Sequence, residues 1–233
     1  MYAFQHGIIA SSNSGGANPL WDGLLAYYTA DNTVNDALGT YNGTLVNGAT
    51  YGTGKINQGF DLDGVNDYVS IPSGTFNPSG DYTISQWINS EPIASNSSRG
   101  IFFVGGNLTT NTISVYLFNN AGTTYIRLIN SNNSTFQLIQ STIPSFNNFH
   151  HIAGIKNTTD NKYYLYVNGV LVSQDTITVN FVPISLSTTI GSLGPSYASF
   201  LGKIDEVGLW DRALTPTEVT ELYNSGAALQ YPN

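Results

Sequence analysis

The feature that most constrains this fold is a long run of short strand-like segments. Over residues 60–172, apolar and aromatic residues occur in short stretches separated by clusters of Gly, Asn, Ser and Pro, and no helical period of useful length is present. Two of these stretches, 113–118 and 125–129, alternate between apolar positions on one face and larger or polar positions on the other. We therefore predict an all-β chain folded as an antiparallel β-sandwich.

The clearest hairpin lies between residues 163–167 and 170–173. The two segments are separated by Asn168 and Gly169, the residue pair that best supplies the two positive φ angles of a type I′ turn. A two-residue turn of this type fixes the register of both strands.

One short helix is predicted near the C-terminus. Thr215 is suited to cap its N-terminus, Pro216 to its first position, and Glu218 to close a capping box with Thr215. We predict a helix over residues 216–224, ended by a left-handed Gly226.

Composition excludes several kinds of function. Only 9% of the residues are charged, and the net charge is −8 with seven scattered Lys and Arg, so a nucleic acid is not an expected partner. Cysteine is absent, which excludes disulfides, thiolate metal sites and a cysteine nucleophile.

Residues 1–19 are predicted to be a flexible N-terminal arm, because they are rich in Ser, Gly and Asn and cannot bury enough apolar surface to fold. The folded domain is expected over residues 20–233. The apolar run at residues 7–10 is too short for a signal peptide, and no segment is long enough to insert into a membrane.

Five segments of the chain together resemble a known family. They read GFDLDGVNDYV, YTISQWI, FHHIAG, LYVNGVLV and GKIDEVGLWDRALTPTEVTELYNSG, at residues 59–69, 82–88, 149–154, 165–172 and 202–226. In this order they resemble the laminin-G-like domains of the concanavalin A-like lectin/glucanase superfamily. The resemblance implies a jelly-roll β-sandwich with one short C-terminal helix.

Enzymatic residues are not evident. A glycosidase needs two carboxylates across a cleft, whereas Glu91 lies in a loop, Glu206 in a strand, Glu218 at a helix cap and Glu221 on a helix surface. The histidines also lack the partners of a triad or zinc site. We predict a non-catalytic protein, with a glycoside hydrolase as the less favoured alternative.

The family resemblance also implies one structural calcium ion. By that resemblance its ligands include Asp31 and Asp205, with Asp36 as a third, and carboxylate oxygens suit this ion. The loop that begins at Asp36 lacks two polar side chains of the family's usual loop. A metal-free site with turn-forming aspartates therefore stays open as the alternative.

Aromatic residues beside polar ones are typical of sugar-binding surfaces, because the apolar side of a sugar ring packs on an aromatic face. Two segments, 116–127 and the loop 193–200, carry such residues. The alternative is that these aromatics pack in the core or against another subunit. The candidate ligand-binding residues are Tyr116, Phe118, Tyr125, Arg127, Tyr197 and Phe200.

Taken together, these features predict a non-catalytic recognition module that binds a glycan or cell-surface polysaccharide. The alternative is a structural or decoration protein of a virion, a fibre or capsid-surface component, that docks into other assembly proteins through residues 1–19. That alternative is motivated by Met1, the missing export signal and the absence of cysteine. Both readings place the protein on a phage particle or outside a cell, and an oligomer is compatible with either.

Overall fold

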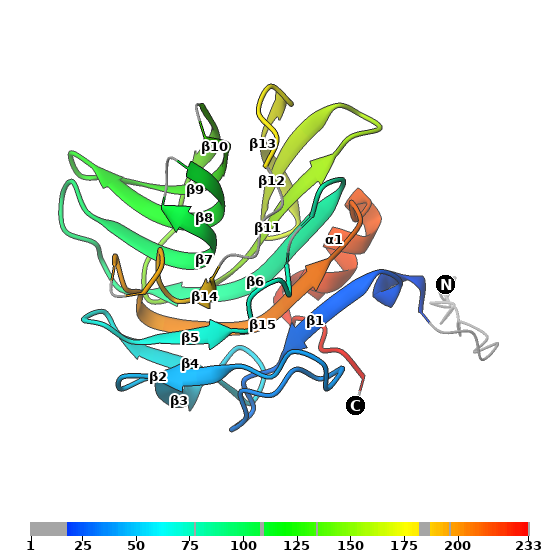
Figure 1. Cartoon of the computed structure of the whole chain (residues 1–233). Helices are drawn as coiled ribbons and strands as arrows, with labels where there is room; N and C mark the ends of the chain where they lie inside the picture. Colours follow the sequence, from blue (N-terminus) through cyan, green and yellow to red (C-terminus); the bar gives the residue numbers. More distant parts are fainter. Residues whose placement is uncertain are drawn as a thin grey trace, which may run out of the picture.

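The computed structural model describes residues 18–76, 78–107, 110–133, 135–181, 187–195 and 197–232. These residues form two antiparallel sheets that face each other as a sandwich, with a short helix beside them (Figure 1). The predicted β-sandwich is thus confirmed. None of the described helices is long and apolar enough to cross a membrane.

The first sheet has eight strands within the described residues. Its order is β13 (Val170–Thr176), β12 (Lys162–Val167), β11 (Phe149–Asn157), β6 (Tyr82–Ser90), β15 (Leu201–Trp210), β4 (Gln58–Asp63) and β3 (Thr50–Thr53), and β1 (Leu24–Tyr28) also pairs with β15. Three tandem strands, β11 to β13, form one edge of this sheet.

The second sheet has seven strands within the same part of the chain. Its order is β10 (Phe136–Thr142), β9 (Thr123–Ser131), β8 (Thr110–Asn120), β7 (Ser98–Asn107), β14 (Thr188–Ile190), β5 (Tyr68–Ile71) and β2 (Thr44–Val46). The chain crosses between the sheets several times, for example from β5 to β6 and from β10 to β11. Such crossings are typical of a jelly roll.

Alternation along the strands places the main core between the two sheets. On β8 and β9 the side chains that point into this core are Ile113, Val115, Leu117, Ile126 and Leu128, all buried. The intervening residues project to the outer face of the seven-stranded sheet, as the sequence predicts.

The predicted hairpin and its turn are confirmed. Asn168 and Gly169 connect β12 to β13 with φ angles of 51° and 74°. A side chain on Gly169 would meet the ring of Tyr223, so glycine is needed here for space as well as for conformation.

The predicted helix forms as α1 (Pro216–Tyr223), with both hydrogen bonds of the Thr215–Glu218 capping box present. Its end differs from the prediction. Asn224, and not Gly226, is the left-handed C-cap residue, with φ of 47° and ψ of 50°. Asn tolerates this conformation better than most residues, so the chain leaves the helix as soon as Asn224 is reached.

The described part of the chain begins at Asn18, two residues before the expected start of the domain. Residues 1–17 of the expected arm lie outside the described residues, but Asn18 and Pro19 belong to the fold. The Asn18 side chain accepts a hydrogen bond from the Leu20 amide at 3.0 Å and donates one to Glu221 at 2.6 Å. These contacts cap a short 3-10 helix, η1 (Pro19–Trp21), and tie it to α1.

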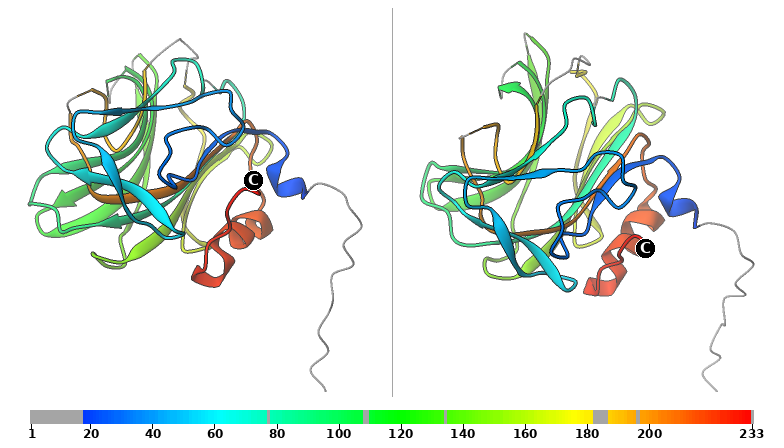
Figure 2. Two further views of the ribbon diagram at one scale, coloured as in Figure 1. Left: turned by 90° about the horizontal axis from the view of Figure 1, so that it is seen from below. Right: turned by 60° about the horizontal axis from the view of Figure 1, so that its bottom comes forward.

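The helix α1, η1 and the C-terminal residues lie side by side on the outer face of the eight-stranded sheet (Figure 2). Beneath them is a second apolar cluster that includes Tyr27, Trp210 and Leu222. A second 3-10 helix, η2 (Asn224–Gly226), follows α1. This outer face is therefore covered over part of its area.

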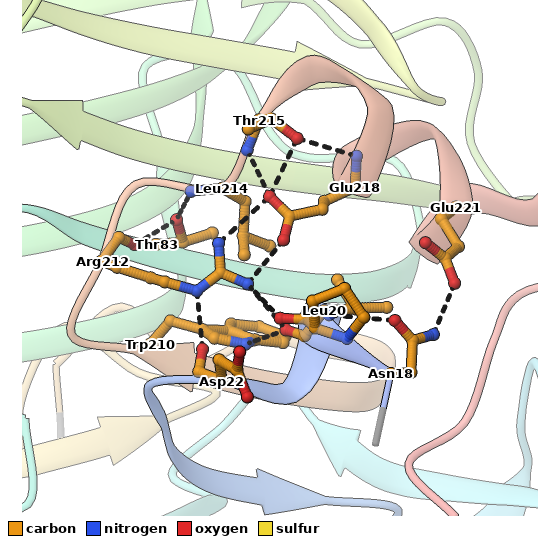
Figure 3. A network of polar contacts seen from close by, with 11 residues as sticks. Asn18, Leu20, Asp22, Thr83, Trp210, Arg212, Leu214, Thr215, Glu218 and Glu221 are labelled. Carbon is orange, nitrogen blue, oxygen red and sulfur yellow. Dashed lines mark hydrogen bonds and ion pairs between the residues drawn. The ribbon is translucent and has the colours of Figure 1, made fainter. Parts of the chain in front are cut away.

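Arg212 holds these segments together (Figure 3). Its guanidinium forms a two-pronged ion pair with Glu218, at 2.6 and 3.1 Å, and donates to backbone carbonyls at the N-terminal end of the fold. Those carbonyls belong to Asp22, Pro19 and Leu20. One side chain thus links β15, α1 and η1.

His150 and His151 are neighbours on β11. Their side chains point to opposite faces of β11, but both are buried. Tyr223 of the helical segment stacks beside His151, with ring centroids 6.3 Å apart. Burial lowers the pKa of His151 to about 3, so this histidine is neutral at ordinary pH.

Candidate functional site

Four of the six predicted ligand-binding residues meet on the outer face of the seven-stranded sheet. In the pairing of β8 with β9, Tyr116 lies opposite Arg127, and Phe118 lies opposite Tyr125. The next strand, β10, places Gln140 opposite Arg127. We call these five residues the Arg127 face.

Arg127 lies at the centre of this face. Its guanidinium carbon is 4.1 Å from the ring centre of Phe118 and 5.9 Å from those of Tyr116 and Tyr125. Its Nε donates to Gln140 Oε1 at 2.8 Å, and a longer bond of 3.4 Å reaches the Tyr116 hydroxyl. These contacts hold the cation in one orientation on a partly exposed surface.

The loop between β14 and β15 borders the Arg127 face. Leu193 and Ala198 of this loop pack with Tyr116 on the outer side of the sheet, and Tyr197 is exposed. Burial raises the pKa of Tyr116, Arg127 lowers it, and the nearby Tyr197 hydroxyl raises it again. Because Tyr197 directly precedes Ala198, it lies at the border of the Arg127 face.

Phe200 does not belong to this surface. Its side chain is 0% exposed and packs in the main core between the sheets. The prediction that Phe200 contacts a ligand is therefore wrong. The loop turns inward before Phe200 because the chain re-enters the eight-stranded sheet at Leu201.

The three predicted calcium ligands do not form one group. Asp36 is buried and its carboxylate accepts four hydrogen bonds of 2.9–3.1 Å from backbone amides of its own loop and of β1. In the part of the chain that the structure describes, no three His, Asp or Glu side chains are arranged to hold a metal ion. Asp36 thus acts as an organiser of the loop after β1.

Asp205 is buried and is satisfied by the backbone. One carboxylate oxygen accepts hydrogen bonds from the amides of Lys55 and Ile56, at 2.7 and 3.0 Å, and the other from the amide of Glu206 at 2.8 Å. Asp31 lies near enough to influence Asp205 electrostatically. These backbone donors offset much of the cost of burying the Asp205 charge.

Glu206 adds another carboxyl group to this cluster. It sits at an irregularity of β15 with φ of 50°, an unusual value for a glutamate. Its carboxyl contacts the Tyr27 hydroxyl at 2.6 Å, and the Gln230 side chain bridges it to Asp31 at 2.8 and 2.9 Å. The C-terminal residues thereby close over the cluster.

The carboxyl groups of Asp205 and Glu206 hold protons unusually strongly. Burial raises the pKa of Asp205 to about 7, against the opposing effect of its backbone donors. Burial and then the charge of Asp205 raise the pKa of Glu206 to about 9. The folded state therefore keeps a proton that the unfolded chain loses at much lower pH.

This cluster predicts a fall in stability on the alkaline side. Because the folded-state pKa values are raised, the stability they contribute is present at low pH and is lost as pH rises through those values. With a chelator present, we expect the melting temperature to fall by a few degrees between about pH 7.5 and 9.5, where histidines are neutral in both states. Thermal unfolding followed by circular dichroism measures this, and Glu206→Gln should flatten the slope. An unchanged slope in Glu206→Gln would contradict the assignment.

Gln140 is the member of the Arg127 face that sequence reasoning misses. The β10 segment follows β9 after a connection that carries no recognised tight-turn pair, so its register is not fixed by local sequence. The alternation of β10 was the only available signal. It indicates which residues share a face, but not which of them lies opposite Arg127.

A sequence model of the concanavalin A-like lectin/glucanases superfamily, Laminin_G_3, matches residues 63–220. No curated protein matches the chain. Domain 4 of AbnA, a GH43 extracellular arabinanase from Geobacillus stearothermophilus solved with arabinotriose, superposes with a TM-score of 0.68 at 22% identity. That alignment covers 88% of this chain and 98% of domain 4.

Toxin binding domains have the same fold. The binding domain of botulinum neurotoxin DC, solved with SialylT, matches at a TM-score of 0.71 and 15% identity over 88% of this chain. The binding domain of Paraclostridial Mosquitocidal Protein 1 matches at 0.70 and 18% over 89%. This chain covers 52% and 53% of those domains, about half of their length. At these identities the likeness shows the fold.

Proposed function

This chain belongs to the concanavalin A-like lectin/glucanases superfamily, and on that premise we propose that it is a non-catalytic module that binds glycans through the Arg127 face. Support comes from similar structures, since one was solved with arabinotriose and another with SialylT. Fold alone is a weak guide to function, so the proposal rests on the chemistry of the face.

The observation that carries the proposal is the fixed guanidinium among aromatic rings. Arg127 presents planar hydrogen-bond donors that suit sugar hydroxyl or carboxylate oxygens, and Gln140 orients it. Tyr125 and Tyr197 provide partly or fully exposed rings on which the apolar side of a sugar can pack. Donors beside stacking surfaces are what recognition of a glycan requires.

The carboxyl groups support a non-catalytic role. Asp205 and Glu206 are neighbouring carboxyls with raised pKa values, a pattern that in an open cleft would suit glycoside hydrolysis. Here the two side chains are 0% and 2% exposed, and the C-terminal residues close over Glu206. A glycosidic bond cannot reach them.

A glycan array tests the proposal. We expect binding to at least one glycan, and we expect Arg127→Ala to weaken it by about tenfold or more, since arginine and aromatic anchors carry much of the energy of such sites. Lys203→Ala is the matched control, because it removes the same charge from an exposed pair with Asp61 on the other sheet. Equal glycan binding by both variants would show that the Arg127 face is not the binding site. Multivalent display is needed because single sites bind sugars weakly.

We further propose that Asp31 and Asp205 hold one calcium ion together with backbone and solvent oxygens. In support, the partly exposed Asp31 lies beside the buried carboxyl groups of Asp205 and Glu206, and among their described hydrogen-bond and ion-pair partners none is a Lys or Arg side chain. Against it, both carboxylates already accept hydrogen bonds. Millimolar calcium should raise the melting temperature relative to chelator, and Asp205→Ala should abolish that difference. Identical melting of the unaltered protein in both conditions would exclude the ion.

The virion alternative gains one supporting observation. The first described residue, Asn18, lies beside α1 on the outer side of the eight-stranded sheet, whereas the Arg127 face lies on the other sheet. A chain anchored through residues 1–19 would thus leave the Arg127 face accessible. Removal of residues 1–17 should leave glycan binding unchanged and abolish incorporation into a particle. Loss of glycan binding in the shortened chain would contradict this arrangement.

A further inference from the structure

A groove of about 300 Å³ lies on the opposite side of the molecule from the Arg127 face. It runs between the outer face of β12 and the segment that leads from β15 into α1, and Leu171 of β13 closes one side. Ala213, Leu214 and Pro216 form the wall on the side of α1. We call it the Tyr164 groove. Its volume is at the lower end of the range of small-ligand sites, about 300–1,000 Å³.

Two tyrosines of β12 form the aromatic wall of the groove. Tyr164 and Tyr166 lie on the same face of the strand, with ring centres 6.5 Å apart and planes inclined by 47°. Tyr166 is buried in the apolar cluster beneath α1, which fixes its position, and Tyr164 is partly exposed. The groove therefore has one anchored ring and one accessible ring.

A set of oxygen acceptors lies at the end of this wall. Asp160 accepts hydrogen bonds from the Tyr164 hydroxyl at 2.9 Å and from the Asn157 side chain at 3.0 Å, and its own amide donates to Asn157 at 3.0 Å. These bonds hold the carboxylate and the tyrosine in place before any ligand arrives. Such prior ordering lowers the entropic cost of binding.

The charge of the groove selects among ligands. Within the described residues its lining contains Asp160 but no Lys or Arg, and Lys162 on the same face donates instead to Gln174. An anionic ligand would face the carboxylate without a cation. A purely apolar ligand would cover Asp160 without offering it a hydrogen bond, which costs free energy.

These features are complementary to a neutral sugar. A sugar ring has an apolar side that can pack on Tyr164 and hydroxyl groups that can donate to Asp160. A quaternary ammonium ion is less well matched, because it needs aromatic faces on several sides and the α1 side of the groove is aliphatic. We propose that the Tyr164 groove is a second saccharide-binding site, specific for an uncharged sugar unit of an oligosaccharide.

The two sites lie on different sheets and face away from each other. The Arg127 face is built on β8, β9 and β10, and the Tyr164 groove on β12 and the residues before α1. A domain with both sites can bind two glycan chains, or two separated parts of one chain. Simultaneous engagement raises the apparent affinity without any new contact.

The test blocks the groove without disturbing its tyrosines. Leu171 and Val172 are neighbours on the edge strand β13, with exposures of 41% and 38%, but only Leu171 lines the groove. In an Arg127→Ala background, which disables the first site, an array of neutral oligosaccharides is screened with Leu171→Trp and with the matched control Val172→Trp. We expect at least one neutral oligosaccharide to bind to Arg127→Ala and to Val172→Trp, and its affinity to fall at least tenfold in Leu171→Trp.

A second variant guards against an indirect effect of the added tryptophan. Tyr164→Phe keeps the ring and loses the hydroxyl that binds Asp160, so it should retain part of the affinity, whereas Tyr164→Ala should lose it. Equal binding by the Leu171→Trp and Val172→Trp chains would overturn the proposal. So would an array on which no neutral glycan binds the Arg127→Ala protein, or one on which acidic glycans alone depend on Leu171. The proposed function of the Arg127 face is tested separately, by measuring glycan binding of the same groove variants with Arg127 intact.

Discussion

Replacing Asp36 with alanine should lower the free energy of unfolding by at least about 3 kcal/mol, because it removes several hydrogen bonds to one buried carboxylate, and bonds to a charged group contribute about 1.5–3 kcal/mol each. The Asp36 carboxylate accepts four such bonds, from the amides of Tyr27, Leu38, Thr40 and Tyr41. Water cannot replace the carboxylate at all four amides, since Asp36 is buried. Urea unfolding measures the change.

Two companion variants show that the number of bonds is the cause. Asp36→Asn retains an oxygen for some of the amides, and we expect an intermediate loss. Asp63→Ala is the matched control, because Asp63 is exposed and its side chain accepts a bond from the Val65 amide at 2.8 Å. It should cost about 1 kcal/mol or less. Similar losses for Asp36→Ala and Asp63→Ala would contradict the role given to Asp36.

Replacing Arg212 with methionine should lower the free energy of unfolding by about 2 kcal/mol or more, because it removes a two-pronged, partly buried ion pair, and hydrogen bonds to a charged group contribute about 1.5–3 kcal/mol. Glu218 would lose both of its contacts with the guanidinium, and three backbone carbonyls near η1 would lose a donor. Methionine retains most of the aliphatic packing of arginine, so the loss reports mainly on the polar contacts. Thermal and urea unfolding measure it.

The same ion pair makes the folding stability of the protein sensitive to acid. Burial acts to raise the pKa of Glu218, but hydrogen bonds from Arg212 and Thr215 outweigh it and lower the pKa. A lowered folded-state pKa contributes stability that is present above the ordinary carboxyl range and is lost as pH falls through the folded value. Arg212→Met should therefore be less sensitive to acid. Lys203→Met is the control, since its pair with Asp61 has a single contact of 3.4 Å, is partly exposed, and contributes about 1 kcal/mol or less. If Arg212→Met lowered the free energy of unfolding no more than Lys203→Met, the role given to Arg212 in linking β15, α1 and η1 would be contradicted.

Local chemistry made much of the fold predictable. Two features depend only on contacts within a few residues, and both can be predicted directly from the sequence. They are the capping box of Thr215 and Glu218 and the turn of Asn168 and Gly169. The left-handed residue that ends α1 was predicted two positions too late, because Asn224 and Gly226 both accept left-handed conformations. A choice between them depends on how the C-terminal residues pack.

Only those residues of the candidate sites that lie on alternating strands could be predicted from the sequence. Alternation placed Tyr116 and Arg127 on outward faces, and pairing of β8 with β9 then brought them together. Alternation could not show that Phe200 turns into the core, because side chains in a loop do not alternate regularly between two faces. Nor could it reveal the Tyr164 groove, whose tyrosines and α1 wall are 47 or more residues apart in sequence and meet only because α1 folds back over the sheet.

Glycan recognition at the Arg127 face is the central claim, and a chemical-shift titration tests it most directly. Isotope-labelled protein is titrated with a glycan identified on the array. We predict saturable shifts of the Arg127 Nε–H signal and of backbone amides of β8 and β9 around Tyr116 and Tyr125, and no such amide shifts in Arg127→Ala. Saturable binding that leaves these signals unmoved, while residues elsewhere shift, would contradict it.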